Sequence, residues 1–272
     1  MPSTTRPRVP RSDGPIGVFD SGLGGLSVLR HVRALLPNED LVYVADSAYL
    51  PYGGKPPELV RERVDEIGGR LIEQGAKALV VACNTATAFG IDALRARFDL
   101  PVIGMEPGVK PAASCTQTGT IGVLATAGTL SSTRFQNLMH KHAGAARVIA
   151  QPCPGWVELV ESGDWHSPAA REKLRHSLMP VLHANADVLV LGCTHFPFLR
   201  DALTGIAGLG VTIIDTGEAV ARELKRRLGQ AGLLAAGPAV GTIRCFTTGD
   251  IDAVRPLVAK LWGAPLTVAS FR

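Results

Sequence analysis

The sequence has few of the features that mark disulfide-stabilised, membrane-spanning or nucleic-acid-binding proteins. Its five cysteines are odd in number and form no CxxC pair, which fits neither a disulfide framework nor a zinc knuckle. No run of about 18 consecutive apolar residues occurs, so the chain is predicted to have no membrane span. The net charge of +4 over 272 residues indicates no nucleic-acid partner, because such a partner requires a clustered basic face.

Nucleotide-binding loops are also missing. The glycines at Gly22 and Gly24 resemble the start of a G-x-G-x-x-G motif, but Ser27 stands where the last glycine belongs. The neighbouring Asp20 would also repel a phosphate. No Walker A sequence occurs, so a dinucleotide fold is the weaker interpretation.

The N-terminal segment lacks the apolar core of a secretory signal peptide. This predicts a cytoplasmic protein whose thiols stay reduced. Residues 1–15 contain four prolines and three arginines, and we expect them to form a disordered or extended leader.

Apolar residues make up 46% of the chain, which is enough for a globular core. From Ile16 onward, short apolar runs alternate with segments of helical periodicity, a pattern typical of α/β units with a parallel sheet. Strands are predicted over 16–19, 41–45 and 78–82, and helices over 26–36, 58–74 and 86–97.

The two halves of the chain repeat one another. The motif IGV occurs at residues 16–18 and again at 121–123, and each copy is followed by a small-residue turn and a helical pattern. Later, each half has an apolar strand that ends at a cysteine, Cys83 after AKALVVA and Cys193 after ADVLVLG. This recurrence of order indicates a duplicated α/β unit.

The repeat predicts an α/β fold with two pseudo-symmetric, doubly wound domains, parallel sheets and an active site in the cleft between them. Residues 16–112 together with 218–272 are expected to form the first domain, with the C-terminal stretch returning onto the first half. Residues 113–217 are expected to form the second.

Cys83 and Cys193 are the candidate catalytic residues. Each follows a strand at the end where open α/β sheets bind ligands, and each is predicted to precede a helix whose N–H groups would lower the pKa of the thiol. Two thiols on opposite sides of a cleft suit inversion of a carbon stereocentre, because one removes a proton as a base and the other returns one as an acid. Since one thiol must hold a proton, we expect a bell-shaped pH profile.

Polar residues beside the cysteines are candidates for assisting roles. Asp20 and Ser21 end the first strand near Cys83, and Asp20 is predicted to orient a substrate ammonium or to assist proton transfer. His195 lies two residues after Cys193 and is predicted to assist there.

Two turns and a loop are candidates for binding the substrate. The turns at 21–25 and 126–129 offer N–H and hydroxyl donors at helix starts, where carboxylates bind as phosphates do. The loop at 50–55, LPYGGK, contains one aromatic hydroxyl at Tyr52 and is predicted to close over a substrate with backbone donors.

At these residues the chain resembles the glutamate racemases of the aspartate/glutamate racemase superfamily. The similarity runs from about residue 16 to about residue 217. The matching stretches are GVFDSGLGGLSVLR (17–30), LPYGGK (50–55), ALVVACNTATA (78–88), GMEPGVKPA (104–112), IGVLATAGTLSS (121–132) and LVLGCTHFPFLR (189–200).

The resemblance implies cofactor-independent interconversion of L- and D-glutamate, with D-glutamate supplying bacterial peptidoglycan synthesis. It implies a cytoplasmic homodimer with no metal, no nucleic-acid partner and no membrane partner. Cys83 and Cys193 match the catalytic cysteines. The positions that match substrate-binding residues are Asp20, Ser21, Pro51, Tyr52, Gly53, Asn84, Thr85, Thr126, Thr129, Glu161, Thr194 and His195.

Three alternatives stay open at this point. An aspartate racemase is the nearest, but such enzymes resemble this chain at the first cysteine and usually show Cys-Thr-Glu at the second, where this chain has Cys193, Thr194 and His195. A decarboxylase or isomerase relative usually lacks one cysteine of the pair or changes its surroundings. A two-lobed small-ligand binding protein would need no reactive thiols. The remaining cysteines, Cys115, Cys153 and Cys245, lack the strand-end arrangement and are expected to be packing or surface residues.

Overall fold

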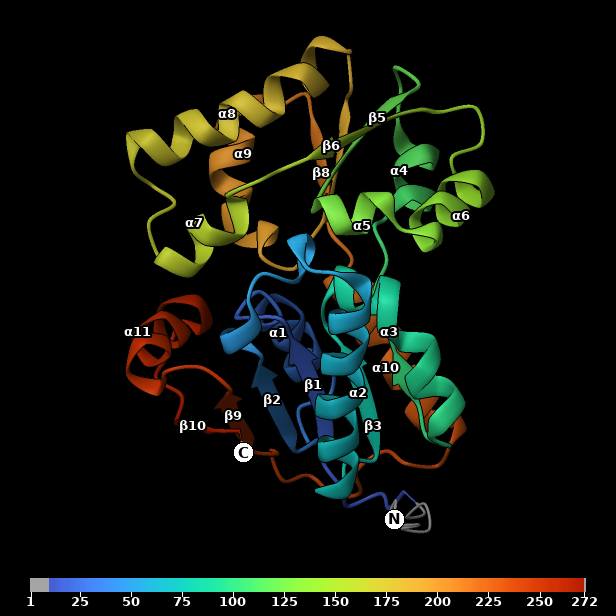
Figure 1. The fold of residues 1–272 in the computed structure, drawn as a ribbon. Helices are drawn as coiled ribbons and strands as arrows, with labels where there is room; N and C mark the ends of the chain where they lie inside the picture. Colours follow the sequence, from blue (N-terminus) through green and yellow to red (C-terminus); the bar gives the residue numbers. More distant parts are fainter. Residues whose placement is uncertain (1–9, 272) are drawn as a thin grey trace.

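The computed structural model describes residues 10–271 and contains two parallel β-sheets, each covered by helices (Figure 1). The first sheet lies in the lower lobe of Figure 1 and the second in the upper lobe. The first comprises β1 (Ile16–Asp20), β2 (Leu41–Ala45), β3 (Ala78–Val81), β4 (Val102–Ile103), β9 (Ile243–Thr247) and β10 (Val268–Ser270). The second comprises β5 (Thr120–Ala125), β6 (Arg147–Pro152), β7 (Val188–Gly192) and β8 (Thr212–Ile214).

Alternate residues of the central strands face opposite helical layers, so both faces of the first sheet are buried. Ile16 and Val18 of β1 pack in the cluster that contains α1 and α10, whereas Phe19 packs in the cluster of α2 and α3. This period of two is what an apolar strand buried on both faces requires. The helices of this lobe are α1 (Leu26–Leu35), α2 (Pro57–Glu73), α3 (Asn84–Arg97), α10 (Gly217–Gln230) and α11 (Ile251–Trp262).

The second sheet is covered in the same manner. One face packs against α4 and α6, and the other against α7, α8 and α9. The helices of this lobe are α4 (Val109–Cys115), α5 (Ala127–Ser131), α6 (Thr133–His142), α7 (Trp156–Ser162), α8 (Pro168–His183) and α9 (Arg200–Ala207). Three short 3-10 turns, η1 (Ser47–Tyr49), η2 (Tyr52–Gly54) and η3 (Phe196–Leu199), lie in the connecting loops.

The two sheets have the same internal order. The first contains the run β2-β1-β3-β4 and the second is β6-β5-β7-β8, with every neighbouring pair parallel. The α/β class, the pseudo-symmetric pair of doubly wound units and the parallel sheets expected from the sequence are therefore confirmed. Strands β9 and β10 join the edge of the first sheet beyond β2, so the C-terminal stretch does return onto the first half. The domain boundaries stay a prediction.

The expected disordered leader needs a correction at its C-terminal end. Residues 10–15 contact the first lobe, where the backbone N–H of Lys77 donates to the carbonyl of Pro15 at 2.9 Å and Nζ of Lys77 donates to the carbonyl of Ser12 at 2.5 Å. A buried ammonium that needs an acceptor is the physical reason for this order. Residues 1–9 lie outside the described part of the chain.

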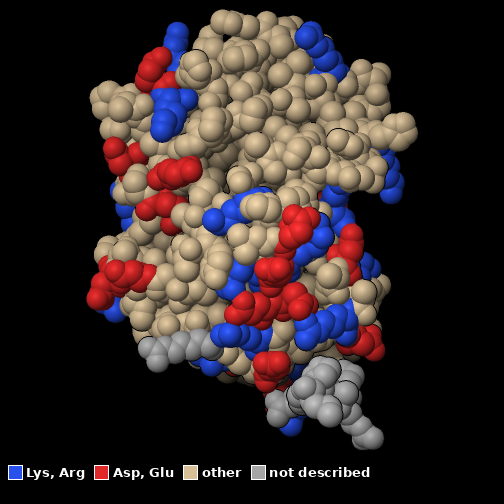
Figure 2. All heavy atoms as spheres, in the orientation of Figure 1, with Lys and Arg blue, Asp and Glu red and all other residues tan. Residues whose placement is uncertain are grey.

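Acidic and basic side chains are interspersed on the face of the first lobe seen in Figure 2. On α2 they pair along the helix, as Glu58 does with Arg61 and Glu66 with Arg70, so neither sign accumulates there. Within residues 10–271, no helix is both long and apolar enough to cross a membrane.

Candidate functional site

A small cavity lies at the carboxyl ends of the strands, between the two lobes. Its walls combine both halves of the chain, with Ser21, Pro51, Tyr52, Gly53, Cys83, Asn84, Thr85, Thr126, Val157, Gly192, Cys193, Thr194 and His195 lining it. The volume is about 10 Å³, which is room for about one water molecule.

The two cysteines occupy equivalent places in the two sheets. Ile16 pairs with Ala78 and Ile121 pairs with Val188, and each cysteine is the fifth residue after the paired residue of its own strand. Cys83 is 6% exposed and Cys193 is 8% exposed, and both face the cavity. The repeat read from the sequence thus brings two thiols to one cavity from opposite lobes.

Cys83 is the N-cap of α3, and its Sγ accepts a hydrogen bond from the backbone N–H of Ala86 at 3.5 Å. The predicted helix N-terminus is therefore present, yet the predicted lowering of the thiol pKa is wrong. Burial raises the pKa of Cys83 well above its ordinary value, and the charge of Asp20 raises it further. Desolvation of a thiolate and a nearby carboxylate outweigh one N–H donor.

Asp20 lies behind the cavity wall and is fully buried. Its carboxylate accepts hydrogen bonds from the backbone N–H of Ser21 at 2.7 Å and of Gly25 at 2.7 Å, and from Oγ1 of Thr194 at 3.1 Å. Burial raises the pKa of Asp20, while the charge of His195 opposes that rise. The carboxylate thus joins the first-strand turn to the second lobe, and it acts on Cys83 by charge.

Cys193 faces a histidine rather than a carboxylate. Its Sγ lies 3.8 Å from Nδ1 of His195, and Nε2 of the same ring lies 2.7 Å from Oε1 of Glu161. Burial alone would lower the pKa of His195, but the hydrogen bonds to Cys193 and Glu161 raise it well above its usual value. The backbone N–H of Gly24 also lies 3.2 Å from Nε2, so the ring joins Cys193 to Glu161 and to the turn after β1.

The close approach of the lobes at this point depends on glycine. A Cβ on Gly24 would lie 2.3 Å from Nδ1 of His195, and one on Gly22 would lie 2.3 Å from Oε1 of Glu161. The same Glu161 oxygen accepts the backbone N–H of Leu23 at 2.6 Å. The turn after β1 therefore docks directly on the histidine–glutamate pair of the other lobe.

Three threonine hydroxyls meet at another side of the cavity. Oγ1 of Thr85 lies 2.9 Å from Oγ1 of Thr126 and 3.1 Å from Oγ1 of Thr129, and the last two are 3.0 Å apart. Thr126 is the N-cap of α5, and Thr85 stands in the first turn of α3. Two helix N-termini and a hydroxyl cluster form a site suited to a carboxylate.

Asn84 contributes an amide with free hydrogen-bonding capacity. It is 4% exposed, lines the cavity, and neither its Oδ1 nor its Nδ2 has a hydrogen-bond partner within residues 10–271. A buried amide without partners is costly, so such a group is typical of a ligand-binding position.

The loop at 50–55 lines the cavity, but its tyrosine hydroxyl points elsewhere. Oη of Tyr52 donates to Oδ2 of Asp46 at 2.5 Å, and the same carboxylate accepts two hydrogen bonds from the guanidinium of Arg63 at 2.9 Å. Asp46 is fully buried, so this hydrogen-bond network fixes the loop at 50–55 on the side away from the cavity. Only the ring and backbone of Tyr52 are left to face the cavity.

The other predicted positions separate into two groups. Ser21, Pro51, Gly53 and Thr194 line the cavity, whereas Asp20, Thr129 and Glu161 stand behind lining residues. Val157 and Gly192 also line the cavity, and sequence reasoning missed them. Nothing in the sequence distinguishes Val157 from the core residues of α7, because its spacing is that of an ordinary apolar face.

The three remaining cysteines lie outside the cavity lining. Cys115 is exposed, while Cys153 and Cys245 are buried, as packing or surface residues would be. Burial raises the pKa of Cys153, and the charge of the nearby Cys193 adds to that rise. Across the described residues, no cluster of three or more His, Cys, Asp or Glu side chains is arranged to hold a metal ion.

Comparison with known proteins gives consistent results. A family model described as Asp/Glu/Hydantoin racemase matches residues 16–224. A glutamate racemase of Pseudomonas putida is 53% identical over 258 residues, which cover 94% of this chain and 97% of the relative. A crystal structure of a glutamate racemase isoform from Bacillus anthracis aligns with a TM-score of 0.88 at 34% identity, covering 95% and 97% of the two chains. A glutamate racemase of Francisella tularensis, solved in complex with D-glutamate, aligns with a TM-score of 0.84 at 29% identity, covering 96% and 98%.

Proposed function

Since the chain belongs to the Asp/Glu/hydantoin racemase family, we propose that it interconverts L- and D-glutamate with the thiols of Cys83 and Cys193. One observation carries this proposal: two thiols from equivalent strand ends of opposite lobes face the same cavity. Inverting a stereocentre requires groups on both faces of the carbon, and a pair of this kind supplies them.

The two thiols have different surroundings. His195, hydrogen-bonded to Glu161, faces Cys193. Burial and the charge of Asp20 keep the proton on Cys83. Inversion requires one thiol of the pair to act as the base and the other as the acid.

In one direction, the thiolate of Cys193 forms an S–H bond with the α-proton, and the electron pair of the broken C–H bond stays on the α-carbon and its carboxylate. The thiol of Cys83 then gives its proton to the opposite face and becomes a thiolate. The opposite enantiomer reacts in reverse, with Cys83 as the base. His195 and Asp20 assist the two thiols.

The α-proton is far less acidic than a thiol, so the site must stabilise the developing negative charge. The hydroxyls of Thr85, Thr126 and Thr129, together with the N-termini of α3 and α5, suit the α-carboxylate. The free amide of Asn84 offers both a donor and an acceptor. Ser21, Pro51, Tyr52, Gly53 and Thr194 complete the binding surface, with backbone groups serving in the loop at 50–55.

A cavity of about 10 Å³ is too small for an amino acid. Glutamate therefore enters when the lobes separate, and their return over the substrate excludes water. Exclusion of water strengthens each polar contact to the carboxylate.

The family resemblance also supports a cytoplasmic homodimer that supplies D-glutamate for peptidoglycan synthesis. Light scattering of the purified protein tests the dimer, and a monomer at micromolar concentration would contradict it. Cell fractionation tests the location, and recovery of the protein outside the cytoplasmic fraction would contradict it.

The central test is racemisation by the purified chain in heavy water. We expect L-glutamate and D-glutamate each to be converted, with deuterium at the α-carbon of the product and no absorbance band of a bound pyridoxal. L-Aspartate is the matched substrate for the nearest alternative. Faster conversion of aspartate than of glutamate would reject glutamate as the substrate.

The pH profile of kcat/KM should respond to Asp20. In the wild type, with the enantiomer whose α-proton Cys193 removes, the acidic limb reports protonation of the base and the alkaline limb reports loss of the proton from Cys83. Because the charge of Asp20 raises the pKa of Cys83, Asp20→Asn lowers that pKa, and the alkaline limb moves to lower pH.

The matched control is Asp99→Asn, an exposed aspartate beyond the end of α3. It should leave both limbs in place. If the alkaline limb of Asp20→Asn stays in place or moves to higher pH, Cys83 is not the group whose deprotonation that limb reports.

A further inference from the structure

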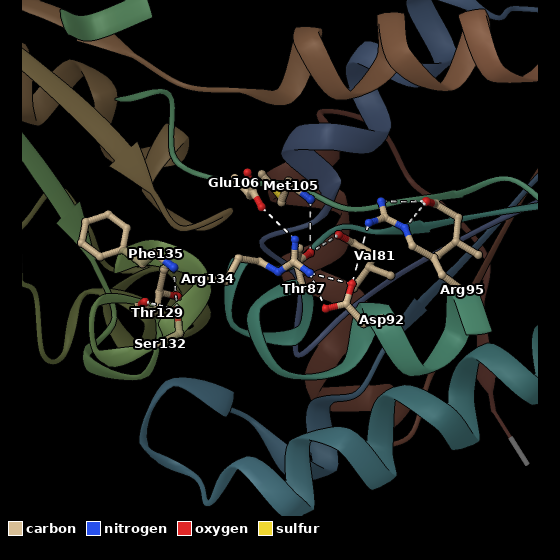
Figure 3. A network of polar contacts seen from close by, with 11 residues as sticks. Val81, Thr87, Asp92, Arg95, Met105, Glu106, Thr129, Ser132, Arg134 and Phe135 are labelled. Atoms are coloured by element: carbon tan, nitrogen blue, oxygen red, sulfur yellow. Dashed lines mark hydrogen bonds and ion pairs between the residues drawn. The ribbon is translucent and has the colours of Figure 1, made fainter. Parts of the chain in front are cut away.

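One arginine outside the cavity joins the two lobes. The guanidinium of Arg134, in α6, donates to both carboxylate oxygens of Asp92, in α3, at 2.7 and 2.6 Å. It also donates to Oε1 of Glu106, in the connection between β4 and α4, at 3.0 Å (Figure 3). Asp92 belongs to the first lobe and Arg134 to the second, so this side chain bridges them.

On the first-lobe side, the bridge and the hydroxyl cluster share one rigid element. Thr85 stands in the first turn of α3, and Asp92 lies about two turns further along the same helix. The backbone of α3 is continuous between them, so a displacement of Asp92 toward or away from α6 moves Thr85 with it.

On the second-lobe side, a serine ties Arg134 to Thr129. Oγ of Ser132 donates to the carbonyl of Thr129 at 2.7 Å and accepts the backbone N–H of Phe135 at 3.1 Å (Figure 3). Phe135 is buried in the core of the second lobe. The start of α6 is thereby fixed relative to Thr129.

The segment that carries Glu106 is fixed to the first lobe in a similar way. The backbone N–H of Met105 donates to Oγ1 of Thr87 at 3.1 Å, and that hydroxyl donates to the carbonyl of Val81 at 3.3 Å (Figure 3). Both acceptors of the Arg134 guanidinium are therefore held by the first lobe.

We propose that Arg134 is a positioning residue that holds Thr126 and Thr129 at the correct distance from Thr85, so that the three hydroxyls bind the carboxylate of the substrate. This inference rests on the proposed function for the identity of that substrate. The side chains of Arg134 and Asp92 are 24% and 78% exposed, and exposed ion pairs add little to folding stability. The bridge therefore acts on the geometry of the site rather than on folding.

The kinetic test compares Arg134→Ala, Arg134→Lys and Asp92→Asn with the wild type. We expect Arg134→Ala to lower kcat/KM for both enantiomers by about ten-fold, mainly through KM, because misplaced binding groups weaken substrate positioning. The melting temperature should stay close to that of the wild type. Arg134→Lys should recover part of the loss in kcat/KM. The double variant Arg134→Ala with Asp92→Asn should be little worse than Arg134→Ala alone, because the two residues share one interaction.

A matched control is Arg97→Ala. Arg97 likewise pairs with an aspartate, but it is exposed and its partner, Asp65, belongs to its own lobe. Its loss should leave KM unchanged.

A second measurement needs no glutamate. Cys83 and Cys193 are buried at the lobe interface, whereas Cys115 is exposed. Loss of the bridge should speed alkylation of Cys83 and Cys193 by iodoacetamide relative to Cys115, as read peptide by peptide with mass spectrometry. Arg97→Ala should leave this ratio unchanged.

The outcomes separate the two proposals. A wild type that does not racemise glutamate rejects the proposed function. The alkylation ratio alone then tests whether Arg134 holds the two lobes together. A wild type that racemises glutamate, with KM and the alkylation ratio of Arg134→Ala both unchanged, rejects the bridge alone. A fall in melting temperature that accounts for the whole loss of activity would also reject it.

Discussion

Alanine at Cys83 or at Cys193 is expected to abolish racemisation of glutamate, with kcat falling by about a thousand-fold or more. Each thiol serves one face of the α-carbon, and a positioned general acid or base contributes about 10²–10⁴-fold. The loss should be similar in the two variants, because each thiol is required in both directions of the reaction. Polarimetry and deuterium incorporation at the α-carbon measure the effect.

The other cysteines supply the matched controls. Cys115→Ala removes an exposed thiol and should keep full activity. Cys153→Ala is the stricter control, because this thiol is buried near Cys193 yet does not line the cavity. Full activity of Cys193→Ala would end the two-thiol mechanism, whereas inactive Cys153→Ala with native circular dichroism would show that a third thiol takes part.

Replacing Lys77 with methionine is expected to have the largest effect on stability. Lys77 is fully buried, and its Nζ lies 2.5 Å from Oε2 of Glu39, which is 2% exposed. Oε1 of Glu39 also accepts the backbone N–H of Ala235 at 2.8 Å. Removing the ammonium leaves a buried carboxylate without its counter-charge, which costs about 3–5 kcal/mol of unfolding free energy.

At roughly 2–4 °C per kcal/mol for a chain of this size, the melting temperature should fall by about 10 °C. The pair precedes β2 and β3, at the end of the sheet opposite the cavity, so kcat of the folded variant should not change. Scanning calorimetry and kinetics below the transition measure the two quantities.

The double variant Lys77→Met with Glu39→Leu distinguishes an unpaired charge from lost packing. An apolar pair of similar volume avoids both desolvation penalties, and such replacements are often neutral or stabilising. We therefore expect the double variant to recover most of the lost stability. A double variant as unstable as Lys77→Met would show that packing, rather than the orphaned carboxylate, causes the loss.

Much of the fold could be predicted because the patterns that specify its strands and helices involve residues close together in the chain. Apolar runs of four to six residues, small-residue turns and helical spacing reproduce strands such as β1, β2 and β3 nearly to the residue. The register of the sheets then confirms that Cys83 and Cys193 are equivalent. A strand that ends at a cysteine in each half is itself a sequence pattern, so the pair could be found without coordinates.

The surroundings of the two thiols could not be predicted in the same way. The sequence places a helix start after each cysteine, and a helix start favours a thiolate. In the folded chain, burial and the charge of Asp20 reverse that preference at Cys83, whereas Cys193 faces His195 instead of a carboxylate. The sign of a pKa shift depends on all neighbouring charges and on solvent exclusion, which spacing along the chain does not report.

By itself, the sequence determined the α/β class, the duplication, the two strand-end thiols and the family to which they point. Only the tertiary structure decided which groups meet across the lobes: Glu161 with Leu23, Thr194 with Asp20, and Arg134 with Asp92. It also turned the hydroxyl of Tyr52 away from the cavity and toward Asp46. The physical reason is the range of the interactions, since strands and helices arise from neighbouring residues while these contacts join side chains that are far apart in the chain.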